Sequence, residues 1–181
     1  LFVGRLVEKK GLRYLVEALP EIVNRVPHAH FTIAGYGPEE PALRQLAVQL
    51  HITDRVTFLG ALPQQALPNL YRRASVFVAP FVPAESGDQE GLPVALTEAI
   101  ACGCPVVVGD LPVLDDVFQQ TDVDMRIRAS DVTTLAAAVV AVLERPEESA
   151  RRAEGLRARL ARRLDWIRIA QRYSEVLENL G

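Results

Sequence analysis

Short apolar runs alternate with longer amphipathic stretches along most of the chain. The runs are rich in Val, Ile and Phe and do not alternate strictly with polar residues, which is typical of strands buried on both faces. The stretches between them repeat apolar residues at spacings of three and four, as Leu12, Leu15, Val16 and Leu19 do, which predicts helices. The predicted strands are Leu1–Val3, Phe31–Ala34, Val56–Leu59, Val76–Ala79, Val106–Val108 and, more weakly, Met125–Ile127.

The order strand, helix, strand recurs five times, which predicts right-handed βαβ units. The expected fold class is therefore α/β: a Rossmann-like, doubly wound parallel sheet of about six strands over residues 1–130. From residue 131 to 181 the pattern is helical only, so we expect a helical C-terminal tail there. Its predicted helices are Leu135–Leu143, Glu147–Leu164 and Trp166–Leu180.

Composition supports one globular domain. The chain has 181 residues, of which 49% are hydrophobic and 24% charged, so it can bury a sizeable core. No apolar run approaches the roughly 18 residues of a membrane span. The net charge of -3 provides no general attraction for nucleic acid, and we interpret the arginines of residues 151–163 as a solvated helix face, because glutamates are interleaved with them.

Two further features bear on context. Cys102 and Cys104 are only two positions apart, which excludes a disulfide framework and predicts buried thiols in a reducing compartment. The chain begins without Met on a segment, Leu1-Phe2-Val3-Gly4, that already has the pattern of a strand entering a turn. We therefore expect a fragment of a longer protein.

Parallel sheets of this type bind ligands at the carboxyl ends of their strands, where the strand order reverses. With the usual order 3-2-1-4-5-6, that point lies between strands 1 and 4. The loops after Val3 and after Ala79 should therefore lie together and carry the chemistry.

The loop after Val3 contains both lysines of the chain. Gly4 permits a close turn, and Arg5 with Lys9 or Lys10 places cations beside a helix that should begin near Gly11. Cations and free helix N–H groups form an anion site, most naturally for phosphates. The alternative is a solvated loop with chance charges, and the predicted switch point favours the phosphate site.

The long loop after Ala79 ends at Glu90 and leads into an apolar helix. Pro93 suits its first turn and Gly103 its end. Glu98 lies inside this helix, where a carboxylate needs a partner. That partner is either a ligand hydroxyl or a nearby arginine, and two carboxylates beside a phosphate site favour a polyhydroxylated ligand attached to phosphate.

Other motifs are less informative. Gly35-Tyr36-Gly37-Pro38 follows strand 2, and a tight turn explains it without a ligand. It is not the dinucleotide fingerprint, which should follow strand 1, so we do not expect NAD. His28, His30 and His51 lie at unsuitable positions and are interpreted as structural or exposed. No metal-ligand cluster is visible, and we expect no metal and no cofactor.

Together these motifs resemble those of the glycosyltransferase group 1 domain, the retaining family 4 enzymes of GT-B fold. The resemblance covers essentially the whole chain. Its most specific part is the pair Glu90 and Glu98, with seven residues between them in a small-residue, apolar frame. It rests on Gly4-Arg5-Leu6, Lys10-Gly11, Gly35-Tyr36-Gly37-Pro38 and the segment from Glu90 to Val107.

The resemblance implies a role for each matching position. Arg5 and Lys10 would clamp the donor diphosphate, and Glu90 would hold the sugar hydroxyls and stabilise the developing positive charge, so these three are the candidate catalytic residues. Glu98 would bind the ribose, and the backbone of Leu62 would contact the base. Backbone groups complete the expected donor site at Gly4, Gly35, Gly91, Leu92 and Val94.

The resemblance also implies the function. The chain would be the C-terminal, nucleotide-sugar-binding half of a retaining enzyme that moves a sugar from a UDP- or GDP-sugar to a saccharide or lipid acceptor in polysaccharide or glycoconjugate synthesis. The N-terminal acceptor domain, with the family's catalytic histidine, would be absent, so we expect this fragment to bind the donor without transferring sugar. The implied location is cytoplasmic, with membrane contact, if any, through the absent half.

Two alternatives remain open: the corresponding half of a GT-B nucleotide-sugar epimerase or phosphorylase, and a non-catalytic nucleotide-sugar-binding module.

The chain also departs from the family pattern. The loop at residues 80–89 is longer than the common form. Strand 5 is followed by Gly109-Asp110-Leu111-Pro112-Val113, and Met125-Arg126-Ile127-Arg128 replaces the usual strand 6 motif, which leaves the details of strand 6 open.

Overall fold

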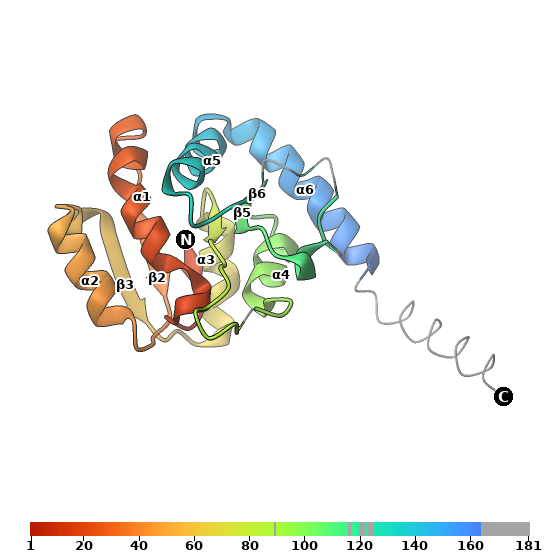
Figure 1. The fold of residues 1–181 in the computed structure, drawn as a ribbon. Coiled ribbons are helices and arrows are strands. Elements are labelled where there is room, and N and C mark those ends of the chain that lie inside the picture. The colour runs from red at the N-terminus through yellow and green to blue at the C-terminus, as the bar shows by residue number, and fades with distance from the viewer. Residues whose placement is uncertain (89, 116, 120–121, 123–124, 164–181) are drawn as a thin grey trace.

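A computed structural model of the protein describes residues 1–88, 90–115, 117–119, 122 and 125–163 (Figure 1). Helices and strands alternate along the chain as the hydrophobic pattern predicts. The strands are β1 (Phe2–Val3), β2 (Phe31–Ala34), β3 (Val56–Gly60), β4 (Phe77–Ala79), β5 (Val106–Gly109) and β6 (Arg126–Ile127). The α-helices are α1 (Leu12–Arg25), α2 (Glu40–Gln49), α3 (Leu67–Arg73), α4 (Val94–Ala101), α5 (Val132–Glu144) and α6 (Pro146–Arg163), and 3-10 turns occur at η1 (Glu8–Lys10), η2 (Thr53–Arg55), η3 (Gln64–Ala66) and η4 (Pro112–Leu114).

All strand pairs are parallel, in two three-stranded sheets with the orders β1-β2-β3 and β4-β5-β6. The expectation of about six strands in one sheet therefore needs correction. The two sheets adjoin at Leu1, whose amine donates to the Val76 carbonyl at 2.9 Å and whose carbonyl accepts from the Val78 N–H at 2.8 Å. These bonds place β1 beside β4, so the spatial order is 3-2-1-4-5-6 and the reversal point lies where the sequence predicts it.

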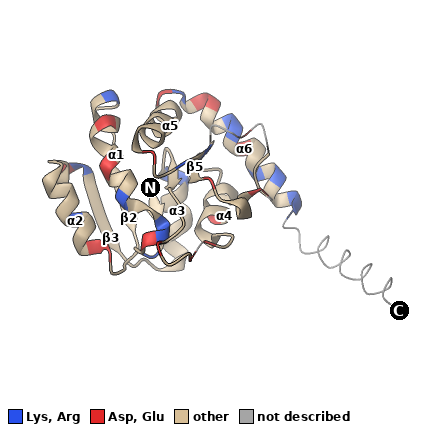
Figure 2. Ribbon diagram, viewed as in Figure 1, with Lys and Arg blue, Asp and Glu red and all other residues tan. Residues whose placement is uncertain are grey.

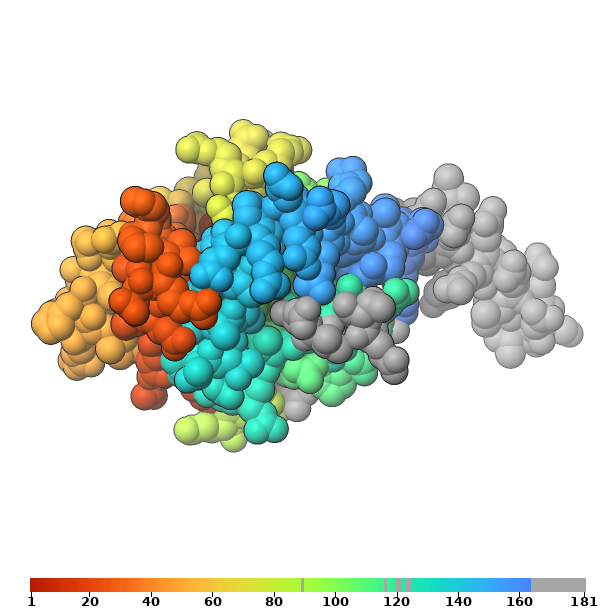
Figure 3. All heavy atoms as spheres, turned by 90° about the horizontal axis from the view of Figure 1, so that it is seen from above, coloured from red at the N-terminus to blue at the C-terminus, as the bar shows by residue number. Residues whose placement is uncertain are grey.

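Helices cover both faces of the strands, which confirms the doubly wound α/β fold. Adjacent residues of one strand enter different cores: Val107 packs in the cluster with α1, α2 and α5, whereas Val106 and Val108 pack with α3, α4 and α6. α5 packs against α1, and α6 packs against α4. Seen from above, α5 lies between α1 and α6 (Figure 3).

The tail is helical as far as it is described. α5 and α6 correspond to the first two predicted helices, and the third, Trp166–Leu180, lies outside the described residues. Figure 2 shows both charge signs along α6, and Arg151 and Arg157 are exposed, in agreement with a solvated face. Arg159 is an exception, because it forms an ion pair with the buried Asp122 at 2.5 Å.

Strand 6 exists, and an arginine explains its unusual sequence. Arg126 of β6 forms ion pairs with Asp110 at 2.5 Å and Asp115 at 2.7 Å, both in the segment that follows β5.

Both cysteines are free thiols, but only Cys104 is buried. Cys102 at the end of α4 is half-buried, so the prediction of two buried thiols is correct for one.

Candidate functional site

The loop after β1 and the loop after β4 meet at the reversal point. The Val82 N–H donates to the Lys9 carbonyl at 3.1 Å. Gly11 makes this approach possible, since its φ of 65° is left-handed and a Cβ there would lie 1.9 Å from the Pro80 carbonyl oxygen. The expectation that these two loops lie together is confirmed.

The centre of this junction is an ion pair between Lys10 and Glu90. Lys10 Nζ lies 3.0 Å from Glu90 Oε2, and the two side chains are only 13% and 15% exposed. The contact is ionic without hydrogen-bond geometry, and Glu90 Oε2 accepts no hydrogen bond from the described residues. Lys10 Nζ also lies over the ring of Phe81, 5.1 Å from its centroid, in a cation–π contact. Both residues were candidates from the sequence, but their pairing was not foreseen.

The side chains of Glu8 and Lys9 also attach the turn η1 to the long loop after β4. Glu8 Oε1 accepts the Glu85 N–H at 2.8 Å, and Lys9 Nζ lies 3.0 Å from Asp88 Oδ2. The hydrogen bond to Asp88 raises the pKa of Lys9 above its ordinary value. Consecutive residues of η1 therefore contact successive parts of the loop, which brings Glu90 against Lys10. Residue 89 lies outside the described residues.

Arg5 points to solvent beside this junction. Its side chain is exposed and makes no hydrogen bond or ion pair within the described ranges.

Gly4 and Gly35 have a packing role: a Cβ on Gly35 would lie 1.8 Å from the Gly4 carbonyl oxygen. The close approach of the turn after β1 to the turn after β2 thus explains these two glycines. Their contact with a donor stays a prediction.

The N-terminus of α4 is open. Pro93 is its N-cap in extended geometry, and the N–H groups of Val94 and Ala95 donate to none of the described residues. Gly91 and Leu92 are exposed, as is Val94. Free N–H groups at a helix start attract negative charge, so this end of α4 fits the expected anion site.

Glu98 lies one turn further along α4 and has two partners. Tyr71 donates its hydroxyl to Oε2 at 3.0 Å, and the side-chain amide of Gln64 donates to Oε1. Burial, followed by Glu98 itself, raises the pKa of Tyr71 above its ordinary range, so this hydroxyl stays protonated. The alternative of a salt bridge to an arginine is wrong: neutral donors satisfy Glu98 in the described structure.

The remaining candidate is Leu62, which follows β3. It is half-buried, and its backbone N–H and carbonyl make no hydrogen bond within the described residues. It lies two residues before Gln64, on the same side of the fold as Glu98. Gln64 and Tyr71 were missed by sequence reasoning, because nothing in the local pattern relates a short helix at 67–73 to a carboxylate on α4.

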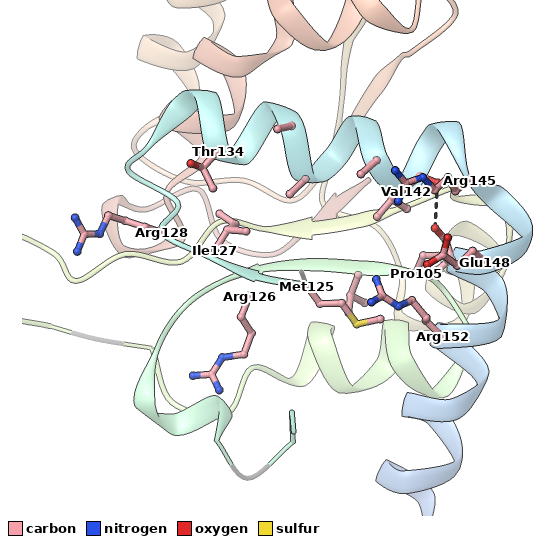
Figure 4. A pocket seen from close by; sticks show the side chains of 15 residues that line it. Pro105, Met125, Arg126, Ile127, Arg128, Thr134, Val142, Arg145, Glu148 and Arg152 are labelled. Atoms are coloured by element: carbon pink, nitrogen blue, oxygen red, sulfur yellow. Dashed lines mark hydrogen bonds between the residues drawn. The ribbon is translucent and has the colours of Figure 1, made fainter. Parts of the chain in front are cut away.

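Two hollows lie elsewhere. One of about 540 Å³ is formed by α5, α6 and the strands β5 and β6, with Met125, Ile127 and Val142 in its wall and Arg145 and Arg152 at one end (Figure 4). Another of about 870 Å³ lies at the amino ends of the strands, near Leu1 and His30. Neither hollow includes Lys10, Glu90 or Glu98.

Within the described ranges, no three His, Cys, Asp or Glu side chains are grouped so that they could hold a metal ion. The expectation of no metal stays a prediction. None of the helices in those ranges is both long enough and apolar enough to cross a bilayer.

Comparison with known proteins identifies the family. The model of the family described as "Glycosyl transferases group 1" matches residues 1–145, most of the chain. The chain therefore belongs to the group 1 glycosyltransferases, as the motifs around Lys10, Glu90 and Glu98 predicted. The α/β fold agrees with that class.

Named relatives give the resemblance more detail. A GDP-mannose-dependent alpha-(1-6)-phosphatidylinositol monomannoside mannosyltransferase from Mycolicibacterium smegmatis is 34% identical over 149 residues, 82% of this chain and 39% of that protein. A putative colanic acid biosynthesis glycosyltransferase, WcaL of Escherichia coli, is 41% identical over 105 residues, 58% of this chain and 26% of that protein. The chain thus spans less than half the length of either relative.

Solved structures share the fold. HepE from Anabaena in complex with UDP superposes with a TM-score of 0.82 at 23% identity, over 98% of this chain and 48% of that one. A mutant of S. aureus TarM in complex with fondaparinux, alpha-GlcNAc-glycerol and UDP gives a TM-score of 0.84 at 15% identity, over 96% of this chain and 34% of that one. The fold is therefore that of a GT-B glycosyltransferase half.

Proposed function

We propose that this chain is the donor-binding half of a retaining glycosyltransferase that takes a sugar from a UDP- or GDP-sugar. The observation that carries the proposal is the half-buried Lys10–Glu90 pair at the reversal point, with exposed Arg5 in the same loop as Lys10 and the open N-terminus of α4 just after Glu90. A cation, a carboxylate and free N–H groups in one place match a phosphate joined to a sugar. The mannosyltransferase relative names GDP-mannose as its donor, and HepE was solved with UDP, so both bases are candidates.

Each end of the donor has a suitable partner. Arg5 and Lys10 would hold the diphosphate, with the Val94 and Ala95 N–H groups facing its charge. Glu90, released from Lys10, would accept hydrogen bonds from the sugar hydroxyls. Glu98 would accept those of the ribose, and the backbone of Leu62 would contact the base. The cations and the start of α4 would stabilise the leaving diphosphate as its negative charge develops.

The acceptor half belongs to the same proposal. This chain covers less than half of its named relatives, so we propose that an N-terminal domain supplies the acceptor site and that this chain alone binds donor without transferring sugar. The acceptor would be a saccharide or lipid, in polysaccharide or glycoconjugate synthesis, as the names of the relatives suggest. We propose a cytoplasmic location, with any membrane contact made by the acceptor half.

Calorimetric titration of the chain with UDP, GDP, ADP and their sugar conjugates tests the proposal. At least one nucleoside diphosphate should bind. Arg5→Ala should weaken it by about 1.5–3 kcal/mol, the value of a hydrogen bond to a charged group, and leave the free nucleoside almost unaffected. Arg25→Ala is the matched control, because Arg25 is an exposed arginine at the far end of α1.

Failure of all three nucleotides to bind would contradict the proposal. Equal weakening of nucleoside and diphosphate by Arg5→Ala would show that Arg5 supports the fold instead. Sugar transfer by the chain alone would contradict the two-domain assignment.

A further inference from the structure

The two oxygens of Glu98 have partners of opposite character. Tyr71, the donor to Oε2, is 1% exposed, and its ring packs edge-on against Phe77 with centroids 5.8 Å apart. Gln64, the donor to Oε1, is exposed and lies on the short turn η3. One partner is therefore held in the core, and the other is at the surface.

This asymmetry constrains the carboxylate. The ring of Tyr71 cannot turn away without opening the core of α3 and α4, so its hydroxyl determines where Oε2 lies. A long, exposed glutamine can rotate into solvent at little cost. Each carboxylate oxygen has about two acceptor positions, so Oε2 keeps one position for a ligand while Tyr71 occupies the other.

We propose that Tyr71 is a positioning residue for ribose recognition, and that Gln64 covers Oε1 of Glu98 until a ribose diol displaces it. This inference rests on the proposed function and specifies how one end of the site works. Tyr71 orients Glu98 so that its two oxygens receive the vicinal hydroxyls together. Gln64 satisfies the carboxylate, which is otherwise in an apolar helix, and leaves when the hydroxyls arrive.

Affinity for a ribose-bearing nucleotide, relative to its 2′,3′-dideoxy analogue, tests the inference. The probe is whichever of UDP, GDP and ADP binds the chain most tightly. Tyr71→Phe keeps the ring and deletes only the hydroxyl, so affinity for the ribonucleotide should fall about fivefold to tenfold, the effect of one hydrogen bond. Affinity for the dideoxy analogue should hardly change, so the preference for ribose should shrink. A purely structural role would weaken both probes alike.

Variants of Glu98 and Gln64 separate the role of Tyr71 from that of Gln64. Glu98→Gln should reduce the same preference, and adding Tyr71→Phe to it should have little extra effect, because the two act as one unit. Gln64→Ala should leave ribonucleotide affinity unchanged or up to about threefold higher, since it removes a competing donor. Tyr14→Phe, on a half-buried tyrosine of α1, is the matched control and should change neither affinity.

The outcomes are distinguishable. If Glu98→Gln reduces the ribose preference and Tyr71→Phe does not, the positioning role is overturned while the ribose assignment stands. A clear loss of affinity in Gln64→Ala would overturn the displacement of Gln64 and make it a ligand contact. If Glu98→Gln leaves the preference intact, or no nucleotide binds, the proposed function itself fails at this end of the site, and the inference fails with it.

Discussion

Lys10 and Glu90 form an ion pair with each other, although the proposed function assigns them to different parts of a ligand. Their contact of 3.0 Å is largely shielded from water, so a diphosphate must compete with Glu90 for the Lys10 amine. Glu90→Gln removes that competitor and one negative charge. We expect it to tighten binding of a plain nucleoside diphosphate by roughly three- to tenfold, and to tighten the nucleotide sugar less or weaken it, because sugar hydroxyls lose an ionised acceptor.

Asp88→Asn is the control for this prediction. It removes the same charge from the same loop but leaves Lys10 paired, since Asp88 contacts Lys9 at an exposed site. Its effect on nucleotide affinity should be small. Equal tightening in both variants, measured by calorimetry, would mean that overall charge and not the Lys10–Glu90 pair controls affinity.

Among the elements, the turn between η1 and α1 determines how closely the two functional loops approach. Gly11 has a left-handed φ of 65° and faces the Pro80 carbonyl. Gly11→Ala should lower the free energy of unfolding by about 1–3 kcal/mol from backbone strain alone, and more because the added methyl collides with the Pro80 carbonyl oxygen. The loops must separate to relieve that collision, so nucleotide affinity should fall as well.

Gly155→Ala provides the opposite case. Gly155 lies inside α6, and the nearest atom to a Cβ there is 3.9 Å away on the flexible Arg159 side chain. The same chemical change should therefore raise the free energy of unfolding by about 0.5–1 kcal/mol, because alanine favours helix. Urea denaturation measures both, and a Gly11→Ala chain as stable as the parent would disprove the tight approach of the loops.

For the whole molecule, the ion pair between Asp122 and Arg159 fastens α6 to the segment between β5 and β6. Asp122 Oδ2 also accepts the Gln119 N–H at 2.8 Å, and its side chain is 9% exposed. Arg159→Ala would leave a buried carboxylate without its cation, which should reduce the free energy of unfolding by about 3–5 kcal/mol. Since α6 packs against α4, such a loss also reaches the helix that carries Glu98.

Arg157→Ala is the surface counterpart, because Arg157 pairs with Glu154 in solvent. Its cost should stay below about 1 kcal/mol. In denaturant titrations, the double variant Asp122→Asn with Arg159→Met should recover part of the stability lost in Arg159→Ala. A small effect of Arg159→Ala would mean that water reaches Asp122.

Local sequence patterns were sufficient to predict the strands, the helices that follow them and the two loops that carry the candidate chemistry. These depend on local patterns: β-branched runs such as Val106–Val108, helical spacing in α1, and glycine or proline at the ends of α4. The sequence also located Lys10, Glu90 and Glu98, because a charge in an apolar or loop setting is visible without coordinates. Arg159 was misjudged as surface charge, since its buried partner Asp122 is far away in the sequence.

Which of these groups contact one another depends on the packing of the folded chain. That packing paired Lys10 with Glu90 instead of leaving both open, and it joined Glu98 to Tyr71, 27 positions away, in place of an arginine. It also divided the strands into two sheets that adjoin through Leu1. Such contacts depend on how α3, α4 and the loop after β4 pack over the strand ends. Each carboxylate in that packing takes whichever donor the fold brings within reach, and no local pattern records that choice.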